Sequence, residues 1–90
     1  MSKTMNPEKI YRELKKRLQY AQDRFDECSA VWTINTRILG KHTSVCTVGM
    51  AYYYEQATSI ASAMEALAPF IGKTFNRSEE LAITMPKELL

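Results

Sequence analysis

The clearest pattern in the chain is a row of apolar residues in its first third, repeating at steps of three and four positions. Such a row lies along one face of an α-helix, and the residues between its members are mostly polar, as a solvent-facing side requires. Its members are Tyr11, Leu14, Leu18, Ala21, Phe25, Cys28 and Trp32. The pattern predicts a helix from about residue 7 to residue 39.

Residues that favour a helix start precede this row. The side chain of Asn6 suits the capping of free backbone amides, and Pro7 has no N–H group that would be left without a partner. Glu8 then places a negative charge at the positive end of the helix dipole. Gly40 is expected to mark the turn after the helix, because glycine readily adopts the left-handed conformation that ends helices.

A second helix is expected from residue 44 to residue 68. Thr43 or Ser44 supplies its cap, and Pro69 ends or kinks it. The spacing of apolar residues gives it an inner row similar to that of the first helix. The members of this row are Tyr53, Gln56, Ile60, Ala63, Leu67 and Phe70.

A short third helix is expected over residues 77–84, because Asn76 and Glu79 have the spacing of a capping box. The three helices together predict an all-α fold in a single domain, residues 1–90. The fold is a long antiparallel helical hairpin, residues 7–39 and 44–68, followed by the short C-terminal helix.

An α+β fold is the alternative. The chain on both sides of Gly40 is rich in Val, Ile and Thr, which favour strands. Two such stretches around a glycine-containing turn are also typical of a β-hairpin, which would cover residues 31–48.

The second predicted helix carries little charge. Residues 44–70 contain only two charged side chains, Glu55 and Glu65, and are rich in Ala, Ser and Thr. A helix that is apolar or small on most sides is usually buried on most sides, and a lone hairpin does not bury all of them. We therefore expect homo-oligomerisation, as a homodimer forming a four-helix bundle or as a higher oligomer. The alternative is a monomer in which the third helix covers the second face.

The amino-acid composition limits the classes of protein to which this chain can belong. With 90 residues, of which 46% are hydrophobic and 24% charged, the chain has room for one modest core and is unlike disordered chains. The net charge is only +2, although residues 1–24 contain seven bases and three acids. Cys28 and Cys46 lack the spacing of a zinc site, so neither a metal nor a cofactor is expected. No signal peptide or membrane span is apparent, and we expect a cytoplasmic protein without membrane contacts.

Five residues are candidates for contacts with a partner or ligand. Successive helical residues point in different directions, so the tyrosines at positions 52 to 54 cannot all face one core. An exposed tyrosine suits a protein interface or stacking on a base. Basic residues of the first helix suit phosphates or acidic side chains, although a solvated face with ion pairs along the helix is the more frequent explanation of such a run. The candidates are Tyr11, Arg12, Lys16, Tyr52 and Tyr54.

No catalytic set can be recognised from spacing, and we predict a non-enzymatic homo-oligomeric protein that binds another macromolecule, an unidentified protein partner. It would act as a regulator, inhibitor or adaptor. The alternative is a module for an anionic ligand such as a nucleotide or nucleic acid, held by the basic residues and a stacked tyrosine. RNA cleavage is a third hypothesis, because the spacing of Arg37 and His42 is similar to that of HEPN ribonucleases. Gly40, however, interrupts the helix on which that family carries its motif.

Overall fold

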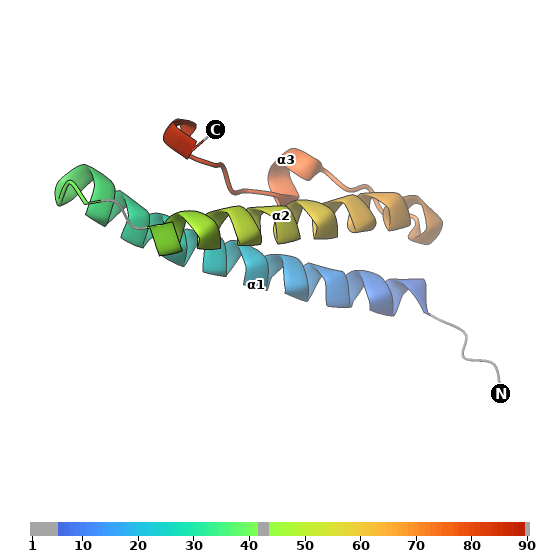
Figure 1. Ribbon diagram of the computed structural model, residues 1–90. Helices are drawn as coiled ribbons and strands as arrows, with labels where there is room; N and C mark the ends of the chain where they lie inside the picture. Colours follow the sequence, from blue (N-terminus) through green and yellow to red (C-terminus); the bar gives the residue numbers. More distant parts are fainter. Residues whose placement is uncertain (1–5, 42–43, 90) are drawn as a thin grey trace.

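The computed structural model describes residues 6–41 and 44–89, which form two long helices and a C-terminal segment (Figure 1). The α-helices are α1 (Pro7–Thr33), α2 (Ser44–Leu67) and the one-turn α3 (Arg77–Glu80). The remaining turns are a π-helical turn after α1 (Ile34–Ile38) and two 3-10 turns (Ala68–Ile71 and Lys87–Leu89). Helices α1 and α2 pack along each other in opposite directions, so the predicted all-α hairpin is confirmed.

The start and the inner face of α1 agree with the prediction. The side-chain oxygen of Asn6 accepts hydrogen bonds from the backbone amides of Glu8 and Lys9, at 3.0 and 3.4 Å. Leu14 and Cys28 are half-buried beside the core. The fully buried members of the apolar row are Tyr11, Leu18, Ala21, Phe25 and Trp32.

The inner face of α2 differs from the predicted one. Three members of the predicted row, Gln56, Ala63 and Phe70, are exposed. Alanines keep the space beside α1 narrow, and methionines fill its gaps because their unbranched side chains adapt to irregular shapes. The residues buried instead are Met50, Ala57, Ala61, Met64 and Ala68.

Gly49 lies where the two long helices approach closely. A Cβ atom at this position would lie 2.8 Å from the Sγ atom of Cys28 on α1. Any larger residue would therefore require a shift of the cysteine side chain or of the helices. Glycine permits the contact.

The alternative β-hairpin over residues 31–48 is wrong for the part of that range that the structure describes. Residues 31–38 continue α1 and its π-helical turn, and residues 45–48 lie within α2. The helix accommodates Thr33 because its hydroxyl donates a hydrogen bond to the carbonyl of Ser29, at 2.8 Å. Gly40 has a φ of 67°, the left-handed conformation expected at the end of the helix.

The third helix is shorter than predicted. It ends at Glu80 instead of residue 84, and the chain continues without helix. Beyond this point Leu81, Ile83 and Met85 pack against the core, whereas the residues between them are exposed. This period of two is typical of an extended chain, in which alternate side chains point to the same side. The extended form brings more apolar side chains onto the hairpin than the predicted last turn of helix would.

Gln22 connects the C-terminal segment, residues 72–89, to α1. Its side chain is 8% exposed and is the only polar side chain buried in the part of the chain that the structure describes. Its amide nitrogen donates a hydrogen bond to the carbonyl of Glu80 at 3.0 Å. Its amide oxygen accepts one from the backbone N–H of Ala82 at 2.8 Å. The side chain therefore pairs with the segment much as a neighbouring strand would.

The C-terminal segment runs back over one side of the hairpin only (Figure 1). The molecule is correspondingly flat, with extents of 57, 28 and 16 Å. No helix among residues 6–41 and 44–89 has the length and apolar character to cross a membrane. Several large apolar side chains remain exposed to solvent: Tyr20, Val31, Ile34, Ile38, Leu39, Val45, Val48, Tyr52 and Phe70.

Replacing Gln22 by leucine should release the C-terminal segment. The apolar side chain leaves the carbonyl of Glu80 and the N–H of Ala82 without partners, which costs about 2 kcal/mol in the free energy of unfolding. Hydrogen exchange at the amide of Ala82 should accelerate strongly in Gln22→Leu. Gln19→Leu, the same change at an exposed position of α1, should leave this amide protected. Equal protection of Ala82 in both variants would contradict the assigned role of Gln22.

Candidate functional site

Three of the five candidate residues, Tyr11, Arg12 and Lys16, lie at the end of α1 that bears the basic residues, and the surroundings of the first two differ. Tyr11 is only 6% exposed, and the ammonium group of Lys73 lies 5.5 Å from the centre of its ring. Burial, and secondarily the charge of Glu80, raises the pKa of the Tyr11 hydroxyl. The ring is therefore part of the core. Arg12 next to it is exposed.

The consecutive tyrosines of α2 point in three directions. Tyr52 is 56% exposed, and its ring contacts that of Tyr53 edge-on, with centroids 5.0 Å apart. Tyr54 is half-buried, and its ring packs against Phe25 of α1 at 6.0 Å. Of the two candidates among them, Tyr52 is therefore the one that offers a broad surface to solvent.

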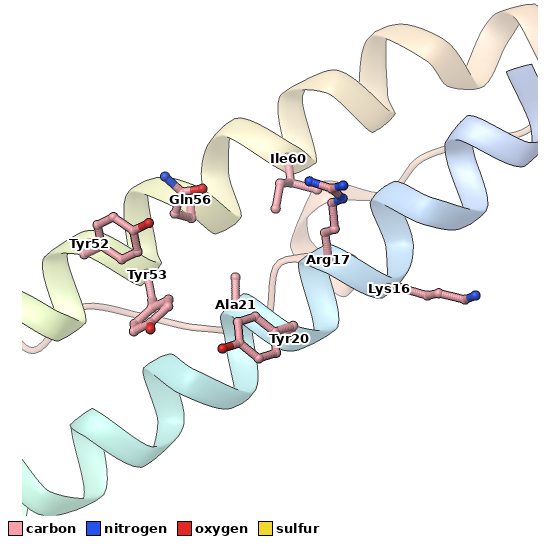
Figure 2. A pocket seen from close by; sticks show the side chains of 8 residues that line it. All are labelled: Lys16, Arg17, Tyr20, Ala21, Tyr52, Tyr53, Gln56 and Ile60. Carbon is pink, nitrogen blue, oxygen red and sulfur yellow. The ribbon is translucent and has the colours of Figure 1, made fainter. Parts of the chain in front are cut away.

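A groove of about 300 Å³ lies between α1 and α2, and we call it the tyrosine groove (Figure 2). It brings together two of the candidate residues, Lys16 of α1 and Tyr52 of α2. It does not include Tyr11, Arg12 or Tyr54. The residues lining it are Lys16, Arg17, Tyr20, Ala21, Tyr52, Tyr53, Gln56 and Ile60.

The chemistry of the tyrosine groove combines aromatic rings with positive charge. Lys16 and Arg17 form no ion pair with another residue in the described part of the chain. No carboxylate lines the groove, and the side-chain amide of Gln56 supplies both a donor and an acceptor. A flat ring that carries an anionic group matches this lining, because rings stack on tyrosine and anions pair with the cations.

Six of the eight groove residues were not among the candidates, including Arg17, Tyr20 and Gln56. Two of them stand four residues after candidates: Tyr20 follows Lys16, and Gln56 follows Tyr52. Residues at this spacing lie on the same face of a helix, so the sequence contained a signal for both. Gln56 was instead predicted to face the core.

The second exposed feature is an apolar surface at the turn end of α1, which we call the tip patch. It consists of Val31, Ile34, Ile38 and Leu39, which are 46 to 73% exposed. No acid or base other than Arg37 occurs between residues 28 and 40. The patch is therefore apolar over more than two helical turns.

Arg37 does not point to an open catalytic site. Its guanidinium group donates two hydrogen bonds to the carboxylate of Glu88, at 3.0 and 3.3 Å, and lies 5.4 Å from the ring of Trp32. It therefore links the C-terminal segment to the hairpin. His42, its partner in the ribonuclease hypothesis, lies outside the described residues, as does the proposed cap at Thr43.

The described residues include no group of three His, Cys, Asp or Glu side chains placed to hold a metal ion. No family model, curated protein or solved structure matches the chain.

Acid should loosen the contact between Glu88 and Arg37. A hydrogen bond from its own backbone amide, assisted by Arg37 and Lys87, lowers the pKa of Glu88. A lowered pKa in the folded state means that the contact stabilises the fold at neutral pH and is lost as the pH falls through that pKa. Because Arg37 lies over Trp32, tryptophan fluorescence should report a transition below the ordinary pKa of glutamate.

The matched variants are Glu88→Gln and Asp23→Asn. Glu88→Gln should show altered Trp32 emission already at neutral pH and lose the acid transition. Asp23→Asn, which neutralises an exposed acid of α1, should retain it. The same transition in Glu88→Gln as in the unaltered protein would show that another group causes it.

Proposed function

We propose that the protein is a small, non-enzymatic, homo-oligomeric helical protein that acts by binding another macromolecule, as a regulator, inhibitor or adaptor. The observation that carries this proposal is the set of large apolar side chains left exposed beside the core. Single exposed apolar residues are ordinary on protein surfaces. Contiguous ones, as in the tip patch and along α2, are typical of interaction sites.

The tip patch is the surface proposed to bind the macromolecular partner. Ile38 is 73% exposed, and it lies one turn from Ile34, which is 49% exposed. The tip patch itself contains no charged residue, and Arg37, the charged residue next to it in sequence, is held in a contact with Glu88. An apolar face of this kind, bordered by polar residues, suits a groove or helix of a partner protein.

The variant Ile34→Asp/Ile38→Asp tests this surface. A protein partner captured with the unaltered chain should bind the variant at least roughly tenfold more weakly, because two buried charges oppose the complex. The control Gln19→Asp/Thr74→Asp adds the same charge at exposed positions outside the tip patch and should bind normally. Circular dichroism should show equal helix content in all three proteins. Undiminished binding by the tip variant, or capture of no partner at all, would refute the proposal.

A second candidate function is supported by the tyrosine groove: binding of a small anionic ligand with a flat ring, such as a nucleotide, or of a nucleic acid strand. Lys16 and Arg17 would meet the phosphate, and Tyr20 or Tyr52 would stack on the ring. The support for it is that both cations, beside three tyrosines, have no ion-pair partner among residues 6–41 and 44–89.

Thermal unfolding with ATP and with a single-stranded oligonucleotide tests the groove. A ligand at about 100 times its Kd should stabilise the fold by about 2.7 kcal/mol, and salt should reduce the effect. Lys16→Ala/Arg17→Ala should abolish the stabilisation. Lys9→Ala/Lys41→Ala removes the same charge from exposed positions outside the groove and should preserve it. Equal losses in both double variants would indicate unspecific attraction by the basic surface.

A further inference from the structure

The outward side of α2 carries a second row of residues, opposite the row that faces α1. Its members stand three or four residues apart, the spacing of a helix-packing face, and every one of them is exposed. We call this row the outer seam. It consists of Val45, Val48, Tyr52, Gln56, Ser59, Ala63, Ala66 and Phe70.

The outer seam is exposed and uncharged. Val45 is 78% exposed and Phe70, on the 3-10 turn that continues α2, is 82% exposed. The two charged residues of α2, Glu55 and Glu65, are not members of the row, and Glu65 pairs with Arg77 of the C-terminal segment. A surface of this composition is costly to leave in water along a whole helix.

Six of the eight residues of the outer seam form three pairs whose members lie at equal distances from the middle of α2. Val45 and Phe70 are equally far from the point between positions 57 and 58, and so are Tyr52 and Ala63. Gln56 and Ser59 flank the same point. In the first two pairs a large residue corresponds to a smaller one, whereas Val48 and Ala66 have no counterpart of this kind within the outer seam.

We propose that a second copy of this chain packs on the outer seam, with the two α2 helices antiparallel and related by a two-fold axis near position 57. In such an arrangement each residue meets the residue equally distant on the other side of the axis. Tyr52 then lies over Ala63 of the second copy, and Phe70 over Val45. Pairing large with small residues lets the helices approach closely and fill the interface without voids.

The available area matches a dimer of this kind. The helix and its 3-10 turn, residues 44–71, are about 40 Å long, and half of a helix about 10 Å wide presents roughly 600 Å² over this length. Two copies would together bury roughly 1,200 Å², where the range of stable specific interfaces begins. The groove-lining Tyr20 beside Tyr52 adds to this area.

This inference rests on the proposed self-association and specifies its surface and register. A parallel pair would place Val45 next to Val45 and Phe70 next to Phe70. Only the antiparallel pair places Val45 next to Phe70. The two residues are separated by almost the whole helix within one chain, so a contact between them can arise only between copies.

Two substitutions that introduce opposite charges test the register of the two α2 helices. Val45→Glu and Phe70→Lys each place a charge at a highly exposed position and suit the dipole of α2, so both should fold. Each alone should raise the dimer Kd at least roughly tenfold, because the charge meets an apolar residue. When both substitutions are present in one chain, the new glutamate of each copy lies next to the new lysine of the other copy, at both ends of the interface. Their attraction should return the dimer Kd to within about threefold of the original.

The control Val45→Glu/Ser59→Lys has the same net charge, with the lysine at a position that meets Gln56 instead of residue 45, and should not restore the dimer. The dimer Kd of each variant is measured by sedimentation equilibrium. Recovery in Val45→Glu/Phe70→Lys alone supports the antiparallel seam. If the unaltered protein associates and the single variants do so equally well, this interface is refuted while self-association stands. A monomeric unaltered protein would refute both.

Discussion

Gln22 pairs with the backbone on either side of Leu81, and the division of the molecule into a covered and an uncovered side follows from this contact. A buried amide is costly unless both of its polar atoms find partners, and here the C-terminal segment provides both. The segment is thereby committed to one side of the hairpin. Arg37 repeats the effect at the turn end by holding Glu88. Residues that might have covered the remaining apolar surface are thus already engaged.

The uncovered surfaces differ in their chemistry, and each suits a different kind of contact. The tip patch is apolar and belongs to the end of α1, the tyrosine groove combines rings with cations, and the outer seam is uncharged along α2. Tyr52 and Gln56 belong to both the groove and the outer seam, so a dimer through the seam would place each groove at the edge of the interface. A ligand in the groove and a second copy on the seam would then influence each other's binding.

The hairpin could be predicted because α1 combines a strong apolar row with a polar remainder and a clear cap at Asn6. The inner face of α2 could not, because its alanines and serines occur on every side and give no contrast between inside and outside. The third helix was predicted to be longer than it is because Leu81 and Ile83 also fit a helical pattern. The pairing of Gln22 with residues 80 and 82 is a long-range contact that no local pattern reveals. In the groove, Lys16 and Tyr52 were identified from residue type alone. Tyr20 stands one turn after Lys16, so its face of α1 could be predicted, but its position beside Tyr52 depends on how the two helices align.

We infer that the hairpin with its C-terminal segment leaves an uncharged face of α2 exposed, and that a second copy of the chain covers this face. The mass of the unaltered protein in solution, measured by sedimentation equilibrium over a range of micromolar concentrations, tests it most directly. We expect a concentration-dependent rise from the chain mass of 10.3 kDa to at least twice that value. A mass that stays at 10.3 kDa throughout would contradict it.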